Sequence, residues 1–196
     1  MRGIEQIPWL YDGLMSLQDR LGLRRWRRWL AGGAGGRVLE VGCGTGRNLP
    51  LYGSGAALVV GIDPAHAAVR TARRRAPGVP LVVARAEALP FRGGAFDTVV
   101  SGLVFCSVAD PMRGLGEVRR VLAPGGSLRM MEHVRSRRRL VAKLQDLGQP
   151  LWTRVQGGCH PNRDTEASVE AAGFAIQAEG RRERGVMRRF TARSST

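Results

Sequence analysis

The segment that most constrains the fold is a cluster of three glycines directly after a short apolar stretch. Residues 38–50 read VLEVGCGTGRNLP, and the turn contains Gly42, Gly44 and Gly46. Glycines in such a turn let the backbone adopt positive φ and pass close to a bound nucleoside. We expect a buried strand, then this turn, then a helix that begins near Arg47 and presents free N–H groups to the ligand.

Beyond this turn, short apolar runs alternate with stretches of helical periodicity. The runs expected to be strands are residues 37–41, 57–62, 80–84, 97–103 and 127–134. Continuous Val/Leu/Ile runs suit strands buried on both faces, and alternation with helices at 65–76 and 110–122 is typical of a doubly wound parallel sheet. Only four residues separate 174–180 from 185–193, so these should form an antiparallel hairpin at the sheet edge. We therefore predict an α/β, Rossmann-like sheet of seven strands with helices on both faces.

Two helices are expected before the first strand. Apolar residues recur at helical spacing over 10–21 and again over 23–30, on the two sides of Gly22. The run AGGAGG then breaks the helical pattern. We divide the chain into residues 1–36, N-terminal helices that cover a substrate or contact a membrane surface, and residues 37–196, the domain built on the sheet.

The chain carries a large excess of positive charge and three cysteines. Thirty-one Lys+Arg against 16 Asp+Glu give a formal net charge of +15, and Lys143 is the single lysine. Such charge can attract nucleic acid or an anionic membrane, although a coding bias toward Arg produces the same skew. Cys43, Cys106 and Cys159 are an odd number without CxxC spacing, so we expect neither a disulfide framework nor a metal site. With no secretory segment and no long apolar run, a cytoplasmic protein is predicted.

The spacing of the glycines distinguishes two classes of nucleotide ligand. A dinucleotide fingerprint GxGxxG counted from Gly42 needs its third glycine at position 47, where Arg47 stands. The spacing present is GxGxG, with the acidic Glu40 two positions before the first glycine. The turn therefore resembles motif I of the class I S-adenosylmethionine-dependent methyltransferases.

Later segments resemble the remaining motifs of this family in order and spacing. The second strand ends in Gly61-Ile62-Asp63-Pro64, and ARAEALPF, SGLVFCSV and LAPGGSL follow at 84–91, 101–108 and 122–128. The resemblance covers residues 37–134 strongly. It implies S-adenosylmethionine as the cofactor, methyl transfer as the reaction and a methyltransferase domain over 37–196.

The resemblance also implies a set of cofactor-binding residues. The methionine end would be held by Glu40, Gly42, Gly44 and Gly46. The ribose would be bound by Asp63, the adenine would be bordered by Pro64, Ala86 and Glu87, and the pocket floor would be formed by Ser101 and Leu103. Where related enzymes often carry an Asp that accepts from the adenine amino group, this chain has Arg85, which only donates. A backbone carbonyl or Glu87 must then recognise the adenine.

Two segments are candidates for the acceptor side. His133 ends the fifth strand, where its imidazole is either a catalytic base or simply a hydrogen-bonded strand terminus. The segment GGCHPNRDT at 157–165 is either a substrate lid or a turn capped by Asp164 or Thr165. With GLVFCSV and EHV, this segment resembles the small methyltransferase-like branch of the family, which implies an alkyl thiol acceptor or a lipid or quinone headgroup.

We therefore expect methyl transfer to a small-molecule thiol, hydroxyl or amine, with His133 as the catalytic residue. An RNA methyltransferase is the alternative, because Arg clusters occur at 73–75, 135–139 and 181–189, but SGLVF stands where base-amino methyltransferases carry an Asn/Asp-Pro-Pro-Tyr/Phe tetrad. A non-catalytic domain is disfavoured because the acidic and glycine positions are all present. Nucleic acid is not expected as a partner, whereas peripheral membrane contact through LGLRRWRRWL at 21–30 stays open.

Overall fold

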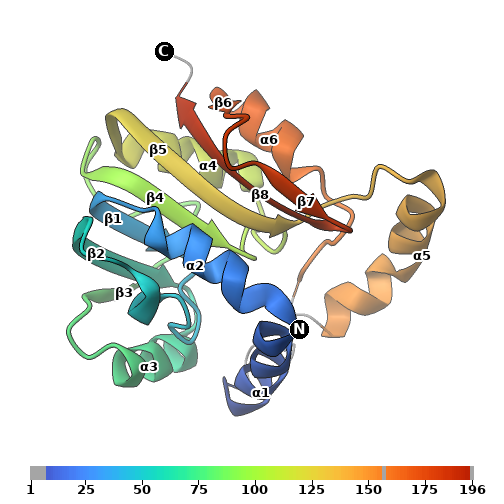
Figure 1. The fold of residues 1–196 in the computed structure, drawn as a ribbon, viewed down its shortest axis with the longest axis horizontal. Coiled ribbons are helices and arrows are strands. Elements are labelled where there is room, and N and C mark those ends of the chain that lie inside the picture. The colour runs from blue at the N-terminus through green and yellow to red at the C-terminus, as the bar shows by residue number, and fades with distance from the viewer. Residues whose placement is uncertain (1–7, 156–157, 195–196) are drawn as a thin grey trace.

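The structure, a computed structural model, describes residues 8–155 and 158–194. Within these residues the chain forms one sheet of eight strands in the order β3-β2-β1-β4-β5-β8-β6, with β7 paired to β8 (Figure 1). The strands are β1 (Gly36–Val41), β2 (Ala56–Asp63), β3 (Leu81–Val83), β4 (Phe96–Gly102), β5 (Leu122–His133), β6 (Phe174–Ile176), β7 (Arg182–Arg184) and β8 (Met187–Ser194). Strands β1 to β5 pair in parallel, and β8 is antiparallel to its three neighbours.

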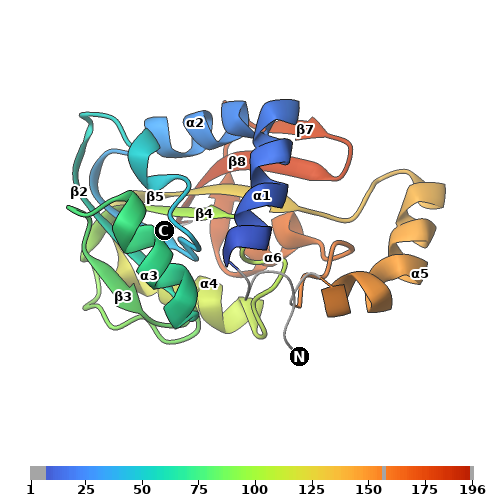
Figure 2. The ribbon, with the colours of Figure 1, turned by 90° about the horizontal axis from the view of Figure 1, so that it is seen from below.

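Helices cover both faces of this sheet (Figures 1 and 2). The helical elements are α1 (Pro8–Gln18), the π-helical η2 (Asp19–Leu23), α2 (Arg24–Gly32), the 3₁₀ turn η3 (Leu49–Leu51), α3 (His66–Arg75), α4 (Pro111–Val121), α5 (Arg139–Val155) and α6 (Thr165–Ala171). Helices α4 and α6 pack on one face, and α2 packs on the other. Helix α4 illustrates the local cause: the Asp110 side chain caps it by accepting from the backbone N–H of Arg113, and Pro111 occupies its first turn.

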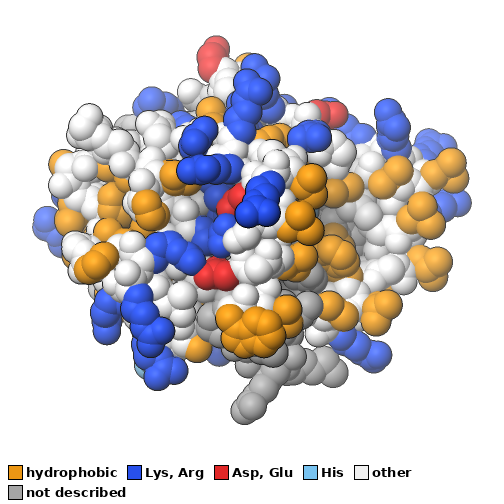
Figure 3. All heavy atoms as spheres, turned by 60° about the horizontal axis from the view of Figure 1, so that its bottom comes forward, with side chains coloured by type: hydrophobic (Ala, Val, Ile, Leu, Met, Phe, Trp, Pro, Cys, Tyr) orange, Lys and Arg blue, Asp and Glu red, His pale blue; other side chains and the backbone are white. Residues whose placement is uncertain are grey.

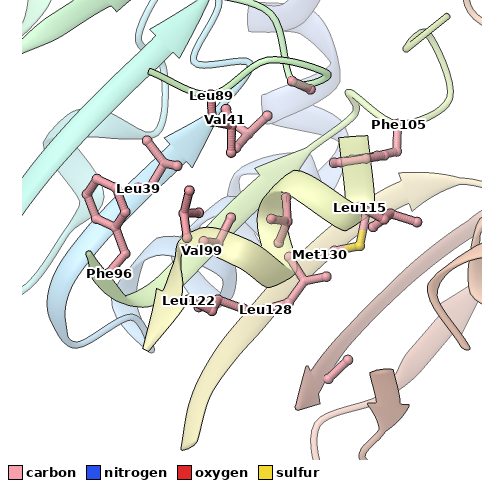
Figure 4. Packing of buried hydrophobic residues seen from close by; sticks show 14 of the residues in the cluster. Leu39, Val41, Leu89, Phe96, Val99, Phe105, Leu115, Leu122, Leu128 and Met130 are labelled. Carbon is pink, nitrogen blue, oxygen red and sulfur yellow. The ribbon is translucent and has the colours of Figure 1, made fainter. Parts of the chain in front are cut away.

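The main core lies between the sheet and α4 (Figure 4). Successive β1 residues point to opposite faces, so Leu39 and Val41 join this core while Val38 packs toward α2. On α4, Leu115, Val118 and Val121 follow one another at helical spacing, and all three are buried in this core. Burial on both faces explains the continuous apolar runs in the sequence.

The parallel order of β1 to β5 and the antiparallel C-terminal pairing agree with the predicted Rossmann-like fold. The expected count of seven strands is wrong, because Arg182–Arg184 adds β7, an exposed polar strand with no apolar pattern to signal it. The predicted antiparallel hairpin at the sheet edge is confirmed and consists of β6 and β8. Strand β8 lies between β5 on one side and β6 and β7 on the other, so β6 and β7 together form that edge.

The helix expected to begin near Arg47 is not present. The glycine turn leads only into the single 3₁₀ turn Leu49–Leu51, after which the backbone of Tyr52 is extended. A partly buried hydrogen bond holds the chain beside β1 at this point, since the Tyr52 hydroxyl donates to Glu40 Oε2 at 2.9 Å. Gly53 follows at once, and glycine disfavours a helix at this point.

The two N-terminal helices occur as predicted, joined by a kink at Gly22, whose φ is +117°. Helix α2 lies on the sheet with Leu30 fully buried, and the guanidinium of Arg129 stacks 4.3 Å from the centre of the Trp29 ring. Within the described residues, no helix is long and apolar enough to cross a membrane.

Candidate active site

A cavity of about 410 Å³ lies at the carboxyl ends of the central parallel strands. These ends are level, since Val41 of β1 is opposite both Ile62 of β2 and Ser101 of β4. From β1 the strand order continues through β2 and β3 on one side and through β4 and β5 on the other, so the topological switch point lies between β1 and β4. Open α/β sheets bind ligands at this point. The turns after β1, β2, β3 and β4 line the cavity together with the end of β5, α1 and α5.

The glycine turn after β1 forms one wall of this cavity. Gly42 has φ of +67°, and a Cβ there would lie 2.3 Å from Val104 Cγ2, so only glycine lets the turn pass beneath the loop that follows β4. Gly44 has φ of +54°, and a Cβ there would meet nothing within 4 Å. Gly46 packs against Ala72 of α3 and does not line the cavity.

Asp63, at the end of β2, ties the glycine turn to its own strand. Its Oδ2 accepts from the backbone N–H of Gly44 and its Oδ1 from that of Ala65, both at 2.9 Å. Burial raises the pKa of this carboxyl, whereas the two backbone hydrogen bonds lower it. Each carboxylate oxygen has a second acceptor position, so Asp63 can still accept from a pair of hydroxyl groups.

Glu40 lies beneath the turn and outside the cavity lining. It accepts from Asn48 Nδ2 at 2.8 Å and from the Tyr52 hydroxyl, and Asn48 accepts from Arg27 at 2.9 Å. Burial raises the pKa of Glu40 to about 7. In this structure Glu40 therefore supports the turn from below.

Four of the five remaining residues assigned to the cofactor line the cavity. Pro64, Ala86, Glu87 and Leu103 line it, and so does Arg85. Glu87 Oε1 accepts from the backbone N–H groups of residues 109 and 110 at 3.2 and 3.4 Å, which links the β3 and β4 loops. Ser101 does not line the cavity.

Ser101 instead belongs to a buried hydrogen-bond network around Glu132. The Oε1 atom of Glu132 accepts from Ser101 Oγ at 3.1 Å and from the N–H groups of Val104 and Phe105 at 3.0 and 3.1 Å, and Oε2 accepts from Cys106 N–H at 3.4 Å. Burial raises the pKa of Glu132, and these hydrogen bonds oppose that shift. The network holds the β4 loop, in which Leu103 adopts a positive φ of +62°. A charged residue inside the apolar run SLRMMEHV was the sequence signal for this network, and our sequence interpretation missed it.

His133 lies on the cavity wall beside two cysteines. One ring nitrogen of His133 and the Sγ atoms of Cys106 and Cys159 all lie within 4.8 Å of one another. A hydrogen bond between the two thiols and the contact with His133 lower the pKa of Cys159. The same hydrogen bond, together with burial, raises the pKa of Cys106. This cluster was not predicted.

The segment at 157–165 contributes both a turn and a cavity residue. Gly157 lies outside the described residues. Asp164 Oδ1 caps α6 by accepting from Ala167 N–H at 3.0 Å, while Cys159 lines the cavity. His160 does not, because its Nδ1 faces Gln149 of α5 at 2.9 Å.

The N-terminal helices close one side of the cavity through Met15 and Gln18. Polar contacts tie this cover to the glycine turn and to α3. Asp12 accepts from Thr45 Oγ1 and from Arg75, both at 2.6 Å, and Asp19 accepts from Arg47 at 2.5 Å. We had assigned none of these residues to the site, because their partners are distant in sequence.

Comparison with known proteins agrees with this geometry. A family model described as a methyltransferase domain matches residues 39–130. The thiol S-methyltransferase TMT1B of Homo sapiens is 38% identical over 158 residues, which are 75% of this chain and 64% of that protein. The demethylmenaquinone methyltransferase of Renibacterium salmoninarum is 34% identical over 113 residues, 56% of this chain and 48% of that protein. The chain therefore spans less than two thirds of the length of these relatives.

Solved structures share the fold at low sequence identity. A chain of the complex between the Haloferax volcanii Trm112 methyltransferase activator and a methyltransferase superposes with a TM-score of 0.74 at 17% identity, with full coverage of both chains. The [4+2]-cyclase SpnF superposes with a TM-score of 0.67 at 22% identity, over 88% of this chain and 80% of that one. These likenesses show the fold alone, and the sequence relatives identify the family. The chain belongs to the class I S-adenosylmethionine-dependent methyltransferases, in the branch that includes the demethylmenaquinone methyltransferases.

Proposed function

We propose that this chain transfers a methyl group from S-adenosylmethionine to a small-molecule acceptor, with a thiol as the favoured acceptor. The observation that carries the proposal is one cavity that joins the glycine turn and Asp63 on one side to His133 and two cysteines on the other. The printed names of the relatives, which include thiol, demethylmenaquinone and phosphatidylethanolamine methyltransferases, support a small acceptor.

The residues present fit this cofactor. The cavity volume is within the range of about 300–1,000 Å³ that is usual for small-molecule sites. Gly44 leaves open space beside the turn, and Asp63 keeps acceptor capacity for a ribose diol. The cofactor would be held by Gly42, Gly44, Asp63, Pro64, Ala86, Glu87 and Leu103. Glu40, Gly46 and Ser101 would not contact the cofactor. They would position the glycine turn and the loop after β4, which do.

When bound, S-adenosylmethionine supplies an electrophilic methyl group. The protein then has to align the acceptor and exclude water. Met15, Gln18 and Trp152 narrow the cavity from α1 and α5, so we assign residues 1–36 as part of its cover and 37–196 as the methyltransferase domain. A thiol has a pKa of about 8.5, so it loses its proton more readily than an alcohol does, and His133 is the base that we assign to accept it.

Cofactor binding tests this proposal first. Calorimetric titration with S-adenosylmethionine should give a saturable one-site isotherm for the wild type. Replacement of Asp63 by alanine removes a charged acceptor, and we expect it to weaken binding by about 1.5–3 kcal/mol. Arg154→Ala, a change on α5 away from the cavity lining, is the control and should bind as the wild type does. Absence of binding by the wild type would remove the methyltransferase assignment, and unchanged affinity of Asp63→Ala would remove Asp63 from the site.

A panel of methyl acceptors tests the proposal that the favoured acceptor is a thiol. Hydrogen sulfide and alkyl thiols should be methylated in the presence of the cofactor, with a smaller rate for phenols and amines. Turnover of phenols or amines without thiols would contradict the thiol assignment and leave the small-molecule function intact. Methyl incorporation into RNA would instead favour the alternative of an RNA methyltransferase.

We also propose that the helices beside the cavity rest on an anionic lipid surface. Exposed large apolar side chains lie on α1, η2 and α5. Figure 3 shows hydrophobic side chains gathered on the right, where Figure 2 places α5, and others near the centre. This apolar surface consists of Trp9, Leu17, Leu21, Leu140, Leu144, Leu147 and Leu151, and Leu147 is 81% exposed. Basic residues on α5 and the net charge of +15 complement anionic headgroups. The stretch at 21–30 contributes only its first residues, because α2 packs on the sheet.

Sedimentation with phosphatidylglycerol vesicles measures this contact. The triple replacement of Leu144, Leu147 and Leu151 by glutamine should lower the bound fraction several-fold, because each buried side chain contributes about 1.5–3 kcal/mol to partitioning. Met112→Gln, an exposed apolar change on α4, is the control and should bind like the wild type. Equal binding by the triple variant would contradict the proposed surface.

A further inference from the structure

We propose that Cys106, His133 and Cys159 bind a zinc ion at the acceptor end of the cavity and leave its fourth coordination position open to the acceptor. The assignment of the fourth ligand as a thiol rests on the proposed function. Metal binding itself does not depend on it. From the sequence we expected no metal site, because the cysteines are odd in number and lack CxxC spacing. The three residues of this cluster come from segments that are far apart along the chain.

The donor set matches zinc in type and in number. Two sulfurs and one imidazole nitrogen lie within 4.8 Å of one another, and zinc prefers thiolate and imidazole ligands. Bonds of about 2.3 Å to sulfur and 2.0–2.1 Å to nitrogen place tetrahedral ligands about 3.5–3.8 Å apart, so distances within the cluster need to shorten by about 1.3 Å at most. Three protein ligands and an open position are typical of catalytic zinc sites, whereas structural sites are closed by four.

The ligands are held together before any metal arrives. The backbone N–H of His160 donates to the carbonyl of Cys106 at 2.7 Å, which joins the two cysteine segments directly. Arg163 donates from one nitrogen to the carbonyls of Phe105 and Val108 at 2.6 and 2.8 Å. These contacts fix the segment after α5 against the β4 loop, so little conformational entropy remains to be lost on binding.

A second set of hydrogen bonds fixes the end of β5 to the same segment. Gln145 donates to the carbonyls of Val134 and Pro161 at 3.1 and 2.8 Å. The Cys106 N–H donates to Glu132, the residue before His133. Outer contacts of this kind orient metal ligands, and their loss costs about 10- to 100-fold in metal affinity.

The open position faces the space in which an acceptor must lie. All three ligands line the same cavity as Gly44 and Asp63. Two thiolates neutralise the charge of the ion, so the site remains compatible with its buried surroundings. A thiol that binds there loses its proton to water, and its sulfur lone pair forms the new S–C bond as the bond between the methyl carbon and the sulfonium sulfur breaks. The products are a methyl thioether and the neutral demethylated cofactor, so charge and atoms balance, and His133 acts as a ligand in place of a base.

Metal analysis of untagged protein, purified with a reductant from zinc-supplemented medium, tests the site. We expect about one zinc per chain in the wild type. Cobalt(II) substituted into the same site should show thiolate-to-metal charge transfer and the intense visible bands of a tetrahedral ion. Cys106→Ser, Cys159→Ser and His133→Asn should each lower zinc retention at least tenfold. Cys43→Ser, a buried cysteine outside the cluster, is the matched control and should retain zinc.

The outcomes separate this site from the methyltransferase assignment. An alkanethiol should change the cobalt charge-transfer spectrum of the wild type and equally that of Asp63→Ala, in which cofactor binding is impaired. Wild-type protein that binds S-adenosylmethionine but neither zinc nor cobalt would overturn the metal site and leave the proposed function standing. Zinc lost equally from Cys43→Ser, or a metal-free protein with a Cys106–Cys159 disulfide detected by mass, would also overturn it. Far-ultraviolet circular dichroism shows whether each of the three ligand variants is folded. A variant whose spectrum differs from that of the wild type is left out, and the other two ligand variants are compared.

Discussion

Replacement of Glu132 by alanine will lower the free energy of unfolding by about 3–5 kcal/mol, because it leaves several buried donors without an acceptor. The donors are the Ser101 hydroxyl and the N–H groups of Val104, Phe105 and Cys106. Urea denaturation followed by circular dichroism measures this change. The β4 loop lines the cavity, so the affinity for S-adenosylmethionine should fall as well.

Glu132→Gln is the matched control for this experiment. The glutamine oxygen can take the place of Oε1, which accepts from three of the four donors, and the amide nitrogen then faces only the Cys106 N–H. We expect a loss of about 1 kcal/mol, a fraction of that in the alanine variant. Equal losses in the two variants would contradict this expectation, because glutamine keeps the volume of the side chain and one acceptor oxygen, and would assign the effect to the negative charge or to Oε2.

Gly42→Ala should lower the free energy of unfolding by about 2–4 kcal/mol, the sum of a left-handed backbone cost and steric overlap. The new methyl group would lie 2.3 Å from Val104 Cγ2 and 2.7 Å from Cγ1. The displaced loop also forms one wall of the cavity, so calorimetry should show at least a tenfold loss of cofactor affinity. Gly44→Ala, where nothing lies within 4 Å of the added carbon, should lose only about 1 kcal/mol of stability.

A second change can separate the two causes of the Gly42 effect. In the double variant with Val104→Ala, both branches that the new methyl group would overlap are removed. The stability losses should then be less than additive by about 1 kcal/mol or more. Additive losses would assign the whole effect to the positive φ of the backbone and none to the packing with Val104.

The sequence was sufficient to predict the core fold because each central strand is a local apolar run and the three glycines stand together in one short turn. It was not sufficient where the cause is tertiary. In place of a helix after the glycine turn, the chain makes one 3₁₀ turn and is held beside β1 by the hydrogen bond from the Tyr52 hydroxyl to Glu40. The cluster of Cys106, His133 and Cys159 likewise exists only because the segments that follow β4 and α5 meet beside the end of β5.

The excess of arginine is partly structural, which the composition did not reveal. Arg27 and Arg188 are 5% and 2% exposed, and Arg27 binds Asp19 and Asn48. Arg129 packs on Trp29 and donates to two carbonyls of α2. These cations hold elements together, so the net charge overstates the number of arginines available to an anionic partner.

The cover formed by α1 has a consequence for the timing of the catalytic cycle. It is attached to the glycine turn and α3 mainly by the carboxylates of Asp12 on α1 and Asp19 on the adjoining η2, while Leu17 of α1 is exposed to solvent. Attractions between partly exposed charges weaken as ionic strength rises, whereas apolar packing does not. The residence time of a bound nucleoside should therefore shorten with added salt. At low salt, dissociation of the demethylated cofactor, and not methyl transfer, would be the rate-limiting step of turnover.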